Sequence, residues 1–227
     1  MMNRFTMMAG LALAVGAGVA SADTITLNFD GIAGGSNATR VRLASRTLPS
    51  GLLNFEIASG AQSGQTLGTF CIDLSQHVAS GDVVYEIADL TAAPTPSVST
   101  YSQAQADAVS AVLANAVALG WIDSRLQADA NQSDYLGRMG AIQAAVWEAL
   151  GETLDLNSGD TSVALHQAYD ILMDQQTFDG SLRVAGLRAL LSDGSQDLLY
   201  VVPLPPAAFA GAGLLAACFG VRAARRR

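Results

Sequence analysis

One cysteine and one glutamine are the residues of this chain whose types and surroundings suit covalent chemistry. Cys71 stands in Thr-Phe-Cys-Ile-Asp-Leu, and the other cysteine, Cys218, lies in an apolar stretch near the end of the sequence. Gln143 stands further along in Ala-Ile-Gln-Ala-Ala-Val-Trp-Glu. A thiolate attacks a carboxamide carbonyl and expels ammonia when the two groups are held in near-attack geometry, and the product is a thioester. A single unpaired cysteine is otherwise a small buried hydrophobe, so both interpretations of Cys71 stay open at this point.

A strand must position the cysteine. Residues 66–74 alternate in a way that predicts a β-strand, with Phe70 on one face and Thr69, Cys71 and Asp73 on the other. Because the neighbours of Cys71 on its own face are polar, we expect that face to line a pocket reachable from solvent.

A helix must position the glutamine. The pattern predicts a helix that begins at 133 or 134 and ends near 151, with Gln143 and Trp147 on its apolar stripe. Gly140 lies one turn before Gln143 and leaves room for a neighbouring backbone to come close. Trp147 lies one turn after Gln143, where its ring would shield a thioester from water.

Together, the aromatic-Cys-aliphatic-acid strand and the aliphatic-Gln-x-x-aliphatic-Trp helix resemble the bacterial thioester domains of surface adhesins. The resemblance implies a covalent bond between the Cys71 sulfur and the Gln143 side chain, with Asp73, Trp147 and Phe70 in supporting roles. It also implies a binding protein, not an enzyme, that captures amine-bearing targets by acylating them through Gln143 and freeing the Cys71 thiol. The alternative is a structural protein of the extracellular matrix in which Cys71 is inert.

The order of the predicted elements indicates an α+β fold, a β sandwich or barrel with an inserted three-helix layer at about residues 102–176. A capping box at Ser102 and Gln105 predicts where the first helix begins, and Gly120 predicts where it ends. Alternating or apolar runs predict the other elements: strands at 25–29, 53–57 and 83–87, a third helix at 163–176, and a closing hairpin of 187–191 with 198–202.

The two ends predict export. Residues 1–22 have the charged start, apolar run and small-residue site of a secretory signal peptide, so we expect one domain at 23–200. Residues 201–227 combine a proline motif, an apolar stretch and terminal arginines, which resembles the PEP-CTERM sorting signals in their VPLPA variant. The resemblance implies an exosortase-type processing protease, transient membrane insertion through the C-terminal helix, and delivery to the cell surface or extracellular matrix. The motif consists of Val202, Pro203, Leu204, Pro205 and Pro206.

Charge and composition disfavour several other functions. The formal net charge is −8, the chain has no lysine, and all 20 acidic residues lie between the two ends. Such an acidic surface argues against nucleic acid as a partner. Two scattered histidines, His77 and His166, give no ligand set for a metal, and no cofactor motif is found. A Cys-His hydrolase or transamidase stays an alternative, and Asp73 and His77 are both candidates for moving a proton, with Asp73 favoured because it shares the strand face of Cys71.

Overall fold

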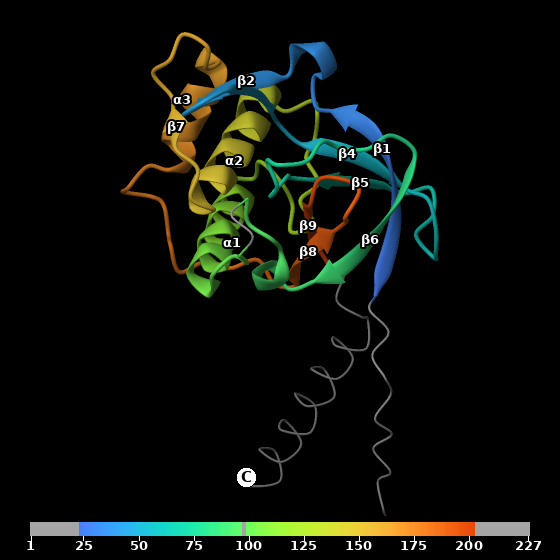
Figure 1. The fold of residues 1–227 in the computed structure, drawn as a ribbon. Helices are drawn as coiled ribbons and strands as arrows, with labels where there is room; N and C mark the ends of the chain where they lie inside the picture. The colour runs from blue at the N-terminus through green and yellow to red at the C-terminus, as the bar shows by residue number, and fades with distance from the viewer. Residues whose placement is uncertain (1–22, 97–98, 203–227) are drawn as a thin grey trace, which may run out of the picture.

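The computed structural model describes residues 23–96 and 99–202 and has an α+β fold, as predicted. Two antiparallel sheets, one of six strands and one of three, flank three helices that lie together on one side of the larger sheet (Figure 1). The elements are β1 (Thr24–Ile32), β2 (Thr39–Leu43), β3 (Thr47–Ser50), β4 (Leu53–Ile57), β5 (Thr66–Thr69), β6 (Asp82–Ala88), α1 (Gln103–Ala118), α2 (Tyr135–Ala149), β7 (Leu154–Asp155), α3 (Val163–Leu172), β8 (Leu187–Leu191) and β9 (Leu198–Val201), with short 3-10 helices at Gly35–Asn37 and Leu90–Ala92.

The larger sheet has the strand order β5-β4-β1-β6-β8-β9 and is open, but its two edges come together at one point. Cys71, just after β5, forms a single antiparallel bridge with Leu198 of β9. Two backbone hydrogen bonds flank that bridge, from Leu199 N to Phe70 O at 2.9 Å and from Ile72 N to Asp197 O at 3.0 Å. The sheet therefore curves far enough to bring its first and last strands into contact.

The strand predicted at 66–74 is too long, because β5 ends at Thr69. From Phe70 onward the chain leaves β4 and takes partners from β9 and α2, so strict alternation of the two faces no longer holds. Phe70, Cys71, Ile72 and Asp73 are all buried. The side chains of this segment therefore have no solvent-facing side.

The helices agree with the predicted ones, apart from the third. Ser102 caps α1 through a capping box with Gln105, as predicted. The third helix ends at Leu172, short of the predicted 176. The small sheet, in the order β3-β2-β7, was not predicted. The two residues of β7 and the proline within β3 leave little periodicity to detect, whereas β2 alternates over its five residues.

The helix α2 is the centre of the helical layer and packs against α1, α3, β2 and β3. Nearly all of its residues from Gly137 to Trp147 are buried, which fits its place between the helices and both sheets. No helix in residues 23–96 and 99–202 is long and apolar enough to cross a membrane. The predicted signal peptide, the residues of the sorting motif after Val202 and the apolar stretch beyond them lie outside the described residues.

Candidate functional site

Cys71 and Gln143 are in direct contact, although they lie 72 positions apart. The Cys71 backbone N–H donates to Gln143 Oε1 at 2.8 Å, and Gln143 Nε2 donates to the Cys71 carbonyl at 2.8 Å. Both residues are almost completely buried, at 2% and 1% exposure. The carboxamide thus pairs with the edge of the sheet as a neighbouring strand would, and the backbone of Cys71 has no unpaired polar group.

A close contact between α2 and the small sheet sets the position of Gln143. Gly140, one turn before it, lies against Thr39 and Ser50, and a Cβ at this position would overlap the Thr39 hydroxyl. Ser50 Oγ donates to the Gly140 carbonyl at 2.8 Å, and Thr39 Oγ1 donates to the Ser50 carbonyl at 2.7 Å. This confirms that Gly140 admits a close approach, although what approaches is the side chain of Thr39 as well as backbone.

The sulfur of Cys71 belongs to a side chain that is almost completely buried. Its Sγ–H donates to the Asp73 carbonyl at 2.9 Å. Burial raises the pKa of the thiol well above its usual range, while the Trp147 side chain and the Asp73 backbone lower it and the carboxylates of Asp73 and Asp197 raise it further. The thiol is therefore protonated at neutral pH, and its proton must leave as the sulfur attacks.

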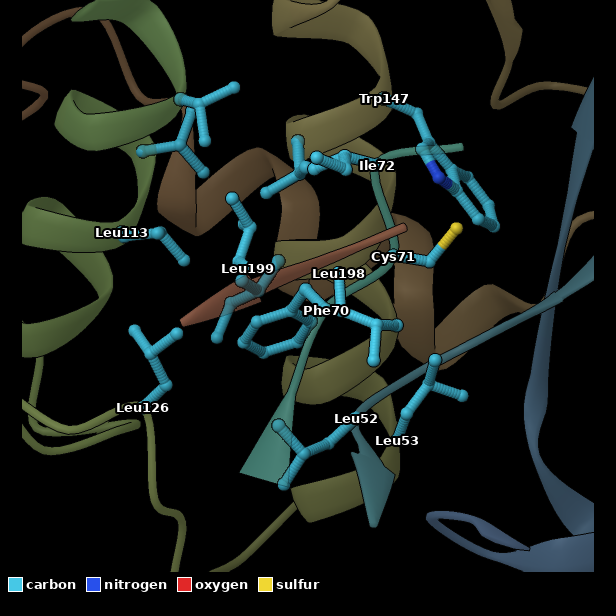
Figure 2. Packing of buried hydrophobic residues seen from close by; sticks show 14 of the residues in the cluster. Leu52, Leu53, Phe70, Cys71, Ile72, Leu113, Leu126, Trp147, Leu198 and Leu199 are labelled. Carbon is cyan, nitrogen blue, oxygen red and sulfur yellow. The ribbon is translucent and has the colours of Figure 1, made fainter. Parts of the chain in front are cut away.

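Cys71, Gln143 and Trp147 line one pocket of about 300 Å³. His77 and Gln196 contribute its other polar side chains, and its remaining walls are mostly apolar, with no Asp, Glu, Lys or Arg. Figure 2 shows the sulfur of Cys71 pointing toward the ring of Trp147 and away from Phe70. The pocket thus gives a small molecule a route to the side chains of Cys71 and Gln143.

Not every residue predicted for the site reaches this pocket. Asp73 and Thr69 are buried and do not line it, so the expectation that their strand face opens to solvent is wrong. Thr69 Oγ1 bonds the Leu199 carbonyl, and Asp73 Oδ1 accepts from Ser75 N and Ser75 Oγ, both at 2.6 Å. Both side chains thus have hydrogen-bond partners within the fold and are held away from the pocket.

The two histidines separate. His77 is exposed and lines the pocket beside Cys71, so it is better placed than Asp73 to move a proton there. His166 lies on α3 and pairs with Asp170, with 3.7 Å between Nε2 and Oδ1. Phe70 lies in the core beside the reacting pair, without lining the pocket. Within the described part of the chain, no three His, Cys, Asp or Glu side chains group in a way that would hold a metal ion.

Sequence reasoning missed three residues that hold the cysteine segment. Gln196 Nε2 donates to the Asp73 carbonyl at 2.5 Å, and Tyr101 Oη donates to the Ile72 carbonyl at 2.7 Å. Asp197, buried beneath the segment, has its pKa raised to about 6, mainly by burial. None of them belongs to a local motif, so only the contact of distant segments reveals them.

This arrangement suits acyl chemistry at the Gln143 carbonyl. A backbone N–H already donates to Oε1, the atom on which negative charge develops when a nucleophile adds to the carbonyl carbon. The sulfur that would attack belongs to the same residue, Cys71, as that N–H donor. One residue therefore supplies both the sulfur and the stabilising hydrogen bond.

The thioester domain family matches residues 68–177 of this chain. The match includes Cys71, Gln143 and Trp147, and it extends from the end of β5 to just beyond α3. It supports a thioester domain and a thioester-bearing protein. No curated protein and no solved structure matches the chain.

Proposed function

We propose that Cys71 and Gln143 condense to a thioester, through which this protein attaches covalently to amine-bearing targets at the cell surface or in the extracellular matrix. The single observation that supports this most is the pairing of the Gln143 carboxamide with the backbone of Cys71, inside a pocket that both side chains line. A residue just after β5 and a residue in the middle of α2 are thereby held in contact.

Formation of the bond balances without a cofactor. The Cys71 sulfur adds to the Gln143 carbonyl carbon, the C–N bond breaks, and the thiol proton leaves with the nitrogen as ammonia. The Cys71 N–H stays on Oε1 throughout, whereas the hydrogen bond from Nε2 to the Cys71 carbonyl is lost with the ammonia. Contact in the folded state supplies the proximity that this attack needs.

Capture of a target is the second step. A primary amine enters the pocket, its nitrogen bonds to the carbonyl carbon of residue 143, and the C–S bond breaks to return the Cys71 thiol. His77, exposed and lining the pocket, is positioned to take the proton that the amine nitrogen gives up. The absence of lysine from the chain removes the commonest internal competitor for the thioester.

The predicted signals at the two ends supply the location in this proposal. The signal peptide at 1–22 exports the chain, and an exosortase-type protease processes the motif at 202–206. The acidic, lysine-free domain at 23–200 then acts outside the cell. Detection of the unprocessed chain in the cytosol, with both ends retained, would contradict this part.

One observation favours the second candidate, an inert structural protein of the matrix. The two hydrogen bonds between Gln143 and Cys71 give a partner to each polar atom of the amide and to the N–H and C=O of Cys71, so the contact has a structural use without any reaction.

Intact mass distinguishes the two functions. The chain, purified unheated in amine-free buffer, should be lighter by one ammonia than the mass calculated from its own termini. Cys71→Ala and Gln143→Ala should each have the calculated mass. A wild-type chain at full calculated mass with a titratable Cys71 thiol would refute the thioester and leave the structural function.

A further inference from the structure

The indole N–H of Trp147 is a buried donor with no hydrogen-bond partner in the described part of the chain. The Trp147 side chain is 4% exposed and its indole nitrogen is buried, so bulk water does not supply the missing acceptor. Buried donors without acceptors are rare because leaving one unpaired costs free energy. A thiol sulfur is a weak acceptor for such a donor and becomes a strong one only when it carries negative charge.

The position of Trp147 identifies that acceptor. Trp147 follows Gln143 by one helical turn, so the two side chains project from the same side of α2. Both line the pocket with Cys71, and the cysteine sulfur points toward the indole (Figure 2). Burial raises the pKa of the Cys71 thiol, and interaction with the Trp147 side chain lowers it, so the indole already faces the sulfur as a donor although it makes no hydrogen bond of ordinary geometry there.

We propose that Trp147 is a catalytic residue of the thioester reaction, whose indole N–H donates a hydrogen bond to the Cys71 sulfur while that sulfur carries negative charge. This role rests on the proposed function and goes beyond shielding the bond from water. Two donors then act at the carbonyl. The Cys71 N–H donates to the oxygen, and the Trp147 Nε1–H donates to the leaving sulfur.

The step balances as follows. The nitrogen of a primary amine bonds to the carbonyl carbon of residue 143, and the pair of electrons of the C–S bond moves to Cys71 Sγ. Trp147 stabilises that thiolate through its N–H and keeps its own proton. The proton lost by the amine nitrogen then ends on the sulfur, which gives the thiol.

Trp147→Phe tests the proposal, because phenylalanine keeps an aromatic cover and removes the N–H. With methylamine as the probe, we expect the variant to keep the ammonia-loss mass, to add methylamine about tenfold more slowly or worse, and to hydrolyse no faster than wild type. Trp121→Phe is the matched control, since Trp121 is also buried but lies under Arg138 and lines no part of this pocket. Addition at the wild-type rate, or faster hydrolysis with unchanged addition, would overturn the role as donor.

A second measurement does not depend on the thioester or on the folding of that variant. In Gln143→Ala, which cannot form the bond, the NMR cross-peak of the Trp147 indole N–H should shift when Cys71→Ala is added, while the Trp121 cross-peak should not. An unmoved Trp147 cross-peak would overturn the contact. A wild-type chain without the ammonia-loss mass would instead refute the proposed function and leave this contact to be judged by the cross-peak.

Discussion

The helix α2 makes two buried polar contacts of opposite character. Toward the small sheet, Gly140, Thr39 and Ser50 form a close contact in which both hydroxyls have acceptors. Toward the large sheet, Gln143 contacts Cys71 beside a pocket. Two buried polar atoms nearby, Trp147 Nε1 and Asp73 Oδ2, have no hydrogen-bond partner among the residues that the structure describes. The first contact has no free space and no unpaired hydroxyl, as expected of a structural contact. The second has an adjoining pocket and unpaired polar atoms, as expected of a site for chemistry.

Gly140→Ala should break the structural contact and have the largest effect. The added Cβ would overlap Thr39 Oγ1 and press on Leu165 and Ser50 O, so α2 must move. We expect the free energy of unfolding to fall by about 3 kcal/mol or more, measured by urea denaturation. Gly159→Ala is the control, because nothing lies within 4 Å of a Cβ there. Equal stability of the two variants would show that α2 is not held by this contact.

Asp197→Asn should reveal a pH-dependent cost beside the reactive contact. Burial raises the Asp197 pKa to about 6, from an ordinary value of 3.8. The folded state therefore favours the protonated acid, and that stabilisation is complete below about pH 4 and is lost as the pH rises through 6. We expect the variant to be more stable than wild type by up to about 3 kcal/mol at pH 8, with no difference near pH 4. Urea denaturation across this range measures it, and a pH-independent difference would contradict the assignment.

Gln143→Ala and Cys71→Ala should differ, although both prevent the thioester. Removing Gln143 leaves the N–H and C=O of Cys71 buried without partners, whereas Cys71→Ala keeps both hydrogen bonds and loses only the sulfur. We expect Gln143→Ala to be the less stable of the two by roughly 2 kcal/mol in thermal or urea denaturation. The opposite order would mean that the sulfur, and not the amide pairing, holds the segment after β5 to α2.

The rate of amine capture should depend on the apolar, uncharged lining of the pocket. We expect butylamine to be acylated several-fold faster than methylamine, since each buried methylene adds up to about 0.8 kcal/mol to the free energy of binding in the pocket. We expect 4-aminobutyrate to react about tenfold more slowly than butylamine, because its carboxylate would enter a mostly apolar pocket that has no Lys or Arg to pair with it. Rates with a small free thioester correct for the intrinsic nucleophilicity of each amine. Equal corrected rates would show that amines reach the bond without entering the pocket.

Local patterns in the sequence were sufficient for the main elements. The capping box at Ser102 and the apolar stripe through Gln143 depend on residues three or four positions apart, which a helix brings together by itself. Strand alternation around β1, β4 and β6 has the same local origin. Within the small sheet, β2 alternates as clearly as β4 and could have been predicted, whereas β3 contains Pro49 and β7 has two residues, and the pairing of Arg42 with Asp155 depends on distant segments.

The sequence by itself indicated the two residues that we propose to form the thioester, because a lone cysteine and a glutamine within an apolar helical stripe are visible as residue types. Only the tertiary structure decided their surroundings. The strand β5 ends at Thr69 because the next backbone groups have other hydrogen-bond partners. The residues on either side of Cys71 bond to the backbone at β9, and Cys71 itself bonds to the Gln143 side chain. With this pairing, Asp73 is buried, whereas His77 and Trp147 line the pocket. Local periodicity could not reveal this arrangement, because the hydrogen-bond partners are 72 or more positions apart in the sequence.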